Sequence, residues 1–213
     1  KLTGEEFEKI EVAHPGYLNF YLTPSYFQEI IAAVLAGKYL EGLAVSDNEK
    51  VMVEYSQPNT HKEFHIGHLR NVFIGSTLVN VLRKAGDDVI AANYIGDTGT
   101  HIAKCLWGLV TFYKNEDLDA IPNKAEFLGK VYSEATQKIE ENPAYEEEFK
   151  GLQKRFEEGD AELVSLWEKT RDWSMEEFNR IYAELGVVFD EFFFESVEEA
   201  EGKEILPELL AKG

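Results

Sequence analysis

The feature that most limits the fold of this chain is a strand, helix, strand pattern between residues 51 and 95. Residues 51–55 and 88–95 are short β-rich runs, and continuous apolar runs are typical of strands covered on both faces. Between them, residues 66–85 have helical spacing, and Gly86 follows as a C-terminal stop. Two parallel strands joined by a helix form a βαβ unit, so the pattern predicts an α/β fold. The stripe expected to face the sheet is Leu69, Phe73, Ser76, Val79 and Leu82.

The residues before this unit indicate a smaller, separate region. Residues 10–22 have extended character with a turn at Pro15 and Gly16, and residues 25–37 follow as a helix. A stretch rich in Gly and polar residues comes next and is typical of a linker. We therefore expect residues 1–46 to be the remnant of a small α+β N-terminal domain with its linker, and residues 47–213 to form the main domain.

Beyond residue 98 the chain is predicted to be mostly helical, as an insertion of about residues 105–186 into the parallel sheet. Phe192, Phe193 and Phe194 are expected to form an exposed apolar patch that promotes self-association. The expected elements are helices at 98–114, 124–141, 143–158 and 160–185, strand-like segments at 187–190 and 192–194, and a short final helix at 202–212.

Charge and cysteine content exclude some classes of protein. The net charge of −19 argues against a general nucleic-acid-binding surface, because phosphate backbones are bound through Lys and Arg. Residues 140–201 hold 20 acidic against 6 basic residues, which we interpret as a solvated helical face. No apolar run reaches the roughly 18 residues of a membrane helix, and a single cysteine, Cys105, fits a reducing compartment. We expect a soluble, cytoplasmic chain without membrane contact.

The stretch that carries chemistry is residues 54–68, where the first strand ends and the first helix begins. Ligands of open α/β sheets bind at the carboxyl ends of strands, and a helix N-terminus favours phosphate. His65 and His68 flank Gly67 with a spacing that lets both imidazoles face one side, and Gly67 allows close approach of a ligand. Two imidazoles and the ammonium of Lys62 suit the charge that develops when an α-phosphate is attacked.

These residues resemble the class I aminoacyl-tRNA synthetases, and the arginyl-tRNA synthetase family in particular. Residues 65–68 match the His-Ile-Gly-His signature of the class, and residues 54–59 resemble the family's Glu-(Phe/Tyr)-Ser-Ser-Pro-Asn. Residues 95–100 resemble Gly-Asp-Trp-Gly-Thr after the second strand, and residues 14–20 are similar to a segment of the N-terminal domain. The resemblance implies a partial Rossmann-type parallel sheet with a helical insertion.

The resemblance also implies roles for individual residues. His65, Gly67, His68 and Lys62 would bind ATP, and the two histidines and Lys62 would stabilise the transition state of adenylation. The α-amino end of arginine would be bound by Glu54, Ser56 and Asn59, and the same pocket would be shaped by Gly96 and Asp97. The implied activity is that of an arginine–tRNA ligase using ATP with Mg²⁺, and its partners are arginine and tRNA(Arg). The chain itself is not expected to supply a metal site.

Two positions of the chain depart from the family pattern. Gln57 replaces the second serine, and Thr98 replaces the tryptophan. The second half of the nucleotide-binding fold, the Lys-Met-Ser-Lys region and the guanidinium-binding residues would follow Gly213 in this family. We therefore expect a piece of a longer protein, inactive by itself and able to self-associate, whose parent is a monomer.

The same residues also fit other functions. His61 and His65 have the i, i+4 spacing of a zinc site, with His68 nearby, although the residues between them do not fit the His-Glu-x-x-His hydrolase pattern. A small-molecule nucleotidyltransferase would share the His-x-Gly-His, and an inactive nucleotide-binding module would share only the fold. His101 receives no role. The aromatic residues at helical spacing are predicted to be core, namely Trp107, Phe112, Trp167, Trp173 and Phe178.

Overall fold

The structure, a computed structural model, describes residues 6–41 and 48–212. The chain divides into two compact units, one of residues 1–49 with 83–87 and one of residues 50–82 with 88–213. Among the described residues, no helix combines the length and the apolar character needed to cross a membrane.

The described N-terminal residues of the first unit, 6–41, form a hairpin followed by a helix. Strands β1 (Phe7–Ala13) and β2 (Tyr17–Leu22) are antiparallel, with Ala13 opposite Tyr17 across the predicted turn. Helix α1 (Pro24–Leu35) begins after Thr23, whose hydroxyl accepts a hydrogen bond from the backbone N–H of Tyr26. A threonine cap followed by proline is a strong start signal, which explains why this helix was predictable. None of the residues of α1 is buried.

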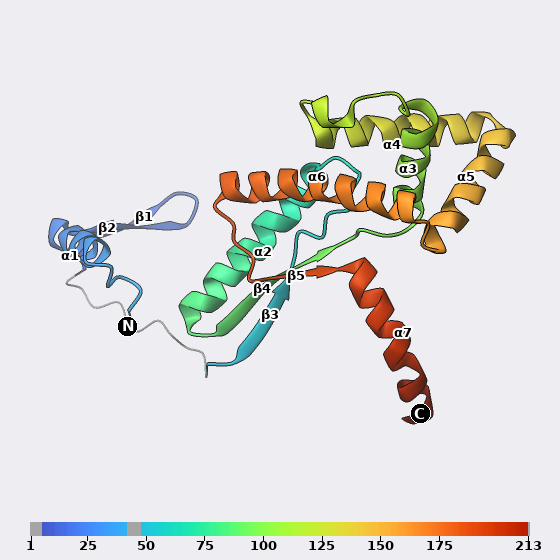
Figure 1. The fold of residues 1–213 in the computed structure, drawn as a ribbon. Helices are drawn as coiled ribbons and strands as arrows, with labels where there is room; N and C mark the ends of the chain where they lie inside the picture. The colour runs from blue at the N-terminus through green and yellow to red at the C-terminus, as the bar shows by residue number, and fades with distance from the viewer. Residues whose placement is uncertain (1–5, 42–47, 213) are drawn as a thin grey trace. The chain divides into compact units, whose positions relative to one another are not determined.

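The second unit contains the predicted parallel sheet, in the order β3, β4, β5 (Figure 1). Strand β3 (Lys50–Glu54) pairs with β4 (Asp88–Ile95), and β4 pairs with β5 (Glu191–Phe194). The central strand β4 is buried along most of its length, as its continuous apolar run predicts. The predicted βαβ unit is confirmed, with α2 (Ile66–Ala85) connecting β3 to β4.

Helix α2 packs on the sheet with most of the predicted stripe, but not with Phe73. Its buried residues are Val72, Gly75 and Val79, whereas Phe73 is 53% exposed. The reason is the close approach at Gly75, where a Cβ atom would lie 2.1 Å from Cγ of Tyr55. The ring of Tyr55 therefore lies directly against the helix backbone, and this contact rotates the helix relative to a stripe chosen by hydrophobicity alone. Of the predicted stripe, Val79 is buried and Leu69, Ser76 and Leu82 are partly buried, so the prediction is wrong only at Phe73.

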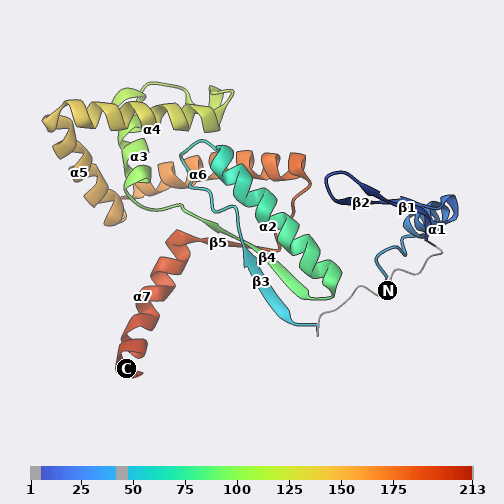
Figure 2. The same ribbon diagram turned by 180° about the vertical axis from the view of Figure 1, so that it is seen from behind.

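The insertion between β4 and β5 forms its own core of four helices (Figure 2). The predicted aromatic core is confirmed, because Trp107, Trp173 and Phe178 are at most 5% exposed and the other two are partly buried against it. Gly186 ends the last helix in a left-handed conformation, as predicted. The helices are α3 (Thr100–Phe112), α4 (Lys124–Glu141), α5 (Pro143–Glu157) and α6 (Ala161–Leu185), with the 3-10 turn η1 (Leu118–Ala120) between α3 and α4.

The last two elements correct the prediction. The extended segment at residues 187–190 is not a strand, and β5 is followed directly by α7 (Glu195–Lys212), seven residues earlier than predicted. The expected exposed patch at the three phenylalanines is also wrong, since all three are half-buried and Phe192 packs against the cluster around Phe178. The exposed apolar residues lie instead on other elements, among them Ile74 and Leu78 of α2.

Candidate nucleotide-binding site

The candidate site lies at the carboxyl ends of β3 and β4. After β3, the chain crosses to the next strand, where Asn59 and Gly96 form an isolated parallel bridge. The N–H of Gly96 donates to the carbonyl of Pro58 at 3.1 Å, and the N–H of Thr60 donates to the carbonyl of Gly96 at 2.9 Å. These bonds extend the sheet by one step, so the loop of residues 55–65, called the β3–α2 loop below, begins from a fixed position.

The structure brings His65 and His68 together at the start of α2. Their rings stack, with centroids 3.9 Å apart and 14° between the planes. The N–H of Gly67 donates to Nδ1 of His65 at 3.1 Å, and the N–H of His65 donates to Nδ1 of His68 at 3.3 Å. In both rings Nδ1 is therefore an acceptor for the first turn's own backbone, which assigns the proton of each neutral imidazole to Nε2.

Gly67 has a more local role than the sequence suggested. A Cβ atom at this position would lie 2.9 Å from Cε1 and 3.0 Å from Nδ1 of His65. The space left by the missing side chain is thus taken by the ring of His65, which folds back over the backbone of Gly67. Glycine at this position permits the hydrogen bond that orients the first imidazole.

Electrostatics keep the second imidazole neutral. Burial, then the neighbouring His65 and then Lys62, lower the pKa of His68 to about 4. At neutral pH this ring carries one proton, so it is a hydrogen-bond donor through Nε2 and not a cation. A neutral donor of this kind is suited to a phosphate oxygen at the N-terminus of a helix.

Lys62, in the β3–α2 loop, contacts the helical insertion and lies near two histidines. Its ammonium is 5.1 Å from the ring centroid of Tyr132 on α4, a cation–π contact. The pKa of His101 is lowered to about 4 by burial first and by Lys62 second, and Nε2 of His101 is buried without a hydrogen-bond partner. No role was predicted for His101, because a single histidine at the start of a helix is not a motif for any site.

The residues expected to bind the amino end of arginine divide into two groups. Glu54 is exposed and accepts a hydrogen bond from the side chain of Gln57, and Asn59 is partly exposed beside Gly96. Glu54 and Gln57 line a cavity of about 250 Å³ with residues of α2. Ser56 is fully buried, and its hydroxyl shares a 2.7 Å hydrogen bond with Tyr182. Ser56 therefore supports the loop, which corrects its expected place on the pocket wall.

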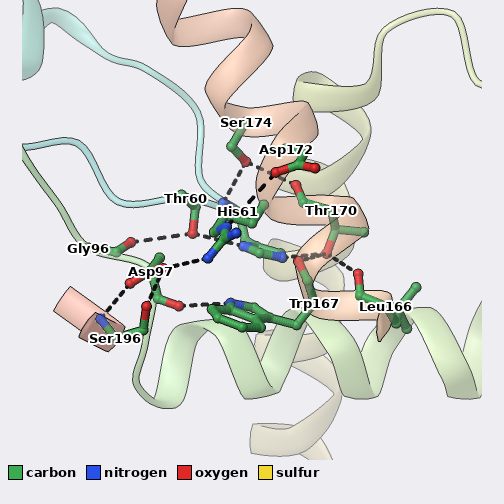
Figure 3. A network of polar contacts seen from close by, with 11 residues as sticks. Thr60, His61, Gly96, Asp97, Leu166, Trp167, Thr170, Asp172, Ser174 and Ser196 are labelled. Atoms are coloured by element: carbon green, nitrogen blue, oxygen red, sulfur yellow. Dashed lines mark hydrogen bonds and ion pairs between the residues drawn. The ribbon is translucent and has the colours of Figure 1, made fainter. Parts of the chain in front are cut away.

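Asp97 was also expected to shape the pocket, but the structure places it in the interior (Figure 3). Its carboxylate accepts hydrogen bonds from the N–H and the hydroxyl of Ser196, both at 2.8 Å, and from Arg171 at 3.3 Å. Its carbonyl accepts a hydrogen bond from Nε1 of Trp167 at 2.9 Å. Asp97 is 99 residues from Ser196 in sequence, and its carboxylate accepts a backbone N–H of the first turn of α7. This bond explains why the helix starts earlier than its own sequence indicates.

Three residues of the β3–α2 loop adopt left-handed backbone conformations. The φ angles are 76° at Ser56, 52° at Gln57 and 61° at His61. Such conformations cost of order 1–3 kcal/mol each and persist only where surrounding contacts determine them. His61 is 0% exposed, and its two ring nitrogens face the hydroxyls of Thr60 and Thr170. The zinc interpretation would need a free ring nitrogen on His61, and the structure gives both nitrogens a partner.

Comparison with known proteins agrees with this architecture. Residues 30–213 match the family described as tRNA synthetases class I (R), catalytic domain. The chain belongs to this family, the class I arginyl-tRNA synthetases. The chain is similar to "Arginine--tRNA ligase" of Bdellovibrio bacteriovorus, with 34% identity over 95% of this chain and 36% of the relative. It is also similar to the protein of the same name in Clostridium perfringens, with 37% identity over 98% of this chain and 38% of the relative.

The fold of this chain is shared by a solved arginyl-tRNA synthetase. The arginyl-tRNA synthetase of Plasmodium falciparum superposes with a TM-score of 0.58 at 22% identity, covering 97% of this chain and 36% of the solved one. The chain thus spans little more than a third of the length of the relatives it matches. Of the two departures from the family pattern, Gln57 contacts Glu54, and Thr98 lines a cavity of about 600 Å³ near the start of α3.

Proposed function

We propose that this chain is the ATP-binding part of an arginine–tRNA ligase, and that the parent protein activates arginine and transfers it to tRNA. A carboxylate oxygen of arginine attacks the α-phosphorus of ATP, pyrophosphate leaves with the electrons of the broken P–O bond, and arginyl-adenylate forms. The terminal ribose hydroxyl of tRNA(Arg) then attacks the carbonyl carbon, and AMP leaves. Membership in the family and the paired imidazoles support this proposal.

The observation that carries the proposal is the arrangement of His65 and His68. Each Nδ1 accepts a backbone N–H, so each Nε2–H is left to donate to a phosphate oxygen. These donors are fixed before the ligand binds, and preorganised donors stabilise the charge that develops on the α-phosphate. Lys62 adds a positive charge, and we expect its side chain to turn from its cation–π contact with Tyr132 to the phosphates when ATP binds.

The amino group of arginine is assigned to the carboxylate of Glu54 and the amide oxygen of Asn59, both suitable acceptors for an ammonium. Gly96 allows this arrangement, because a Cβ atom there would lie 2.2 Å from Oδ1 of Asn59. Mg²⁺ enters with the phosphates of ATP. In the part of the chain that the structure describes, no group of three His, Cys, Asp or Glu side chains gathers to hold a metal ion.

The wider setting is part of the same proposal. Residues 1–46 belong to an N-terminal domain and residues 47–213 to the first half of the catalytic domain, with a helical insertion at about residues 105–186. The parent works in the cytoplasm as a monomer, and the chain alone self-associates. The exposed apolar residues of α2, such as Ile74 and Leu78, support self-association, because patches of this kind are normally covered.

Calorimetric titration of the chain with ATP and Mg²⁺, with and without arginine, tests the proposal. We expect His65→Ala and His68→Ala each to weaken ATP binding about tenfold or more, the cost of losing a hydrogen bond to a charged group. His14→Ala, an exposed histidine of the first unit, is the matched control and should bind as the unmodified chain does. Equal affinity in all three variants, or a wild-type chain that does not bind ATP, would contradict the proposal.

A further inference from the structure

One stripe of helix α6 contacts the β3–α2 loop along its length. Thr170, Ser174, Phe178 and Tyr182 are spaced four residues apart, so they lie on one face of the helix, and all four are buried. Their partners in the loop, Ser56 and His61, are between 109 and 126 residues away in sequence. The comparisons with known proteins assign nothing to this stripe.

The first contact is at His61, between two threonines (Figure 3). The backbone N–H of His61 donates to Oγ of Ser174 at 3.0 Å, and Nε2 lies 2.7 Å from Oγ1 of Thr170. The hydroxyl of Thr170 donates to the carbonyl of Leu166 at 2.7 Å, so it must accept from Nε2–H of His61. The remaining nitrogen, Nδ1, then accepts from the hydroxyl of Thr60 at 3.0 Å, a proton that Thr60 shares with the carbonyl of Gly96 at 3.3 Å.

This orientation requires an uncharged ring at His61. Burial first, then His101 and Arg171, lower the pKa of His61 to about 3. A neutral ring with one donor and one acceptor satisfies both threonine hydroxyls at once, so the chain of hydrogen bonds from Thr60 to Leu166 has a single direction. The left-handed backbone of His61 is thereby held from both its main chain and its side chain.

The second contact is at the start of the loop. Nδ2 of Asn93 donates to the Tyr182 oxygen at 3.0 Å, and the Tyr182 hydroxyl shares a 2.7 Å hydrogen bond with Oγ of Ser56. Oδ1 of Asn93 accepts the N–H of Gln57 at 3.2 Å. Both left-handed residues at this end, Ser56 and Gln57, are therefore held by one buried network that joins α6 to β4.

The third contact connects the stripe to the paired imidazoles. The ring centroid of Phe64 lies 5.8 Å from that of Phe178 and 6.1 Å from that of Tyr182. The same Phe64 ring lies 5.1 Å from the ring of His68, which stacks on His65. A continuous set of packed side chains thus runs from α6 to the two histidines.

We propose that Thr170, Ser174 and Tyr182 are positioning residues, which hold the β3–α2 loop in its left-handed conformations and so set where His65 and His68 present their Nε2 atoms. The proposal deepens the proposed function, because it names the part of the insertion that shapes the phosphate site. None of the three residues touches the ligand. Their effect passes through His61, Ser56 and Phe64.

The test is Thr170→Val, which keeps the shape of the side chain and removes the hydroxyl that accepts from His61. We expect amide hydrogen exchange of the β3–α2 loop to rise about tenfold, as one buried hydrogen bond is lost. In NMR titrations the midpoint of His68 should move from about 4 towards 6.5, since a ring that is no longer held becomes more solvated. Thr170→Ser should restore both values.

The matched control is Thr136→Val on α4, because Oγ1 of Thr136 is buried without a hydrogen-bond partner. It removes the same group from the same insertion and should leave the loop exchange and the His68 midpoint unchanged. If Thr170→Val does not fold, Tyr182→Phe is used in its place, because it removes the hydroxyl that bonds to Ser56, and the same two values are measured. Its control is Tyr145→Phe, since the Tyr145 ring packs in the insertion core.

The outcomes separate this proposal from the proposed function. Both readouts are taken without ATP, so a chain that fails to bind ATP would count against the ligase proposal alone. A Thr170→Val or Tyr182→Phe variant that folds and keeps wild-type loop exchange and a wild-type His68 midpoint would overturn the positioning role. A control that changes these values as much as its partner would overturn it as well, because the effect would then be a general loosening of the insertion.

Discussion

The two ends of the segment of residues 61–68, which joins the β3–α2 loop to the first turn of α2, hold histidines in opposite surroundings. At the buried end, His61 is 0% exposed, and both ring nitrogens face threonine hydroxyls. At the surface end, His65 is exposed, His68 is partly exposed, and each ring has only its Nδ1 engaged by the backbone. Hydrogen-bond capacity therefore separates a supporting histidine from a binding one. A ring that has used both nitrogens supports the fold, and a ring with one nitrogen left can bind a ligand.

The largest expected difference between the two ends is in stability. His61→Ala should lower the free energy of unfolding by about 3–5 kcal/mol, because it leaves a cavity and removes two buried hydrogen bonds, those of the ring to Thr60 and Thr170. His65→Ala should change it by no more than about 0.5 kcal/mol, as is usual for exposed positions. Urea unfolding followed by circular dichroism measures both values. Equal losses of unfolding free energy for His61→Ala and His65→Ala would contradict the distinction between the buried and the surface end.

The second expected difference is in the pH dependence of stability. Burial lowers the folded-state pKa of His61 to about 3 from 6.5, so between these values the unfolded chain binds a proton that the folded chain does not. Stability is therefore fully present above pH 6.5 and is lost as the pH falls towards 3. Within this window, the unfolding free energy of the wild type should fall more steeply than that of His61→Gln by about 1.4 kcal/mol per pH unit.

His68 and His101 also have lowered pKa values, but both remain in the His61→Gln variant, so the difference between the two slopes isolates His61. Denaturant titrations at a series of pH values give the slopes. Parallel slopes for the two proteins would mean that His61 is protonated in the folded state, which would contradict the hydrogen-bond direction from Thr60 to Thr170.

The same division separates what the sequence could predict from what it could not. The βαβ unit, helices α3–α6 and the His65–His68 pair follow from local signals, namely periodicity, Pro and Gly breaks, and a spacing of three residues. The role of Ser56 depends on Tyr182, which is 126 residues away, and the role of Asp97 depends on Ser196, which is 99 residues away. No local pattern encodes such partners.

The predicted inner face of α2 was wrong at Phe73 for a related reason. Hydrophobicity assigned Phe73 to the inner face, whereas the contact that decides the orientation is between a residue without a side chain, Gly75, and the ring of Tyr55. A stripe of apolar residues identifies a helix reliably, but close backbone packing determines which way the helix is turned. The residues that hold the site were therefore the hardest to predict from the sequence, since small or polar side chains add little to a hydrophobic pattern.

The smallest expected effect is at Gly67 in the first turn of α2, at the surface end of the segment. Gly67→Ala places a Cβ atom 2.9 Å from Cε1 of His65, so the exposed ring must turn away and lose its bond from the N–H of residue 67. Stability should change by no more than about 0.5 kcal/mol, because alanine favours the helix while a weak exposed bond is lost. The informative readout is the tautomer of His65 from ring nitrogen shifts, which should change from Nε2–H alone to a mixture. An unchanged tautomer would mean that Gly67 does not orient this ring, whereas a large loss of stability would show that the surface end is as tightly packed as the buried one.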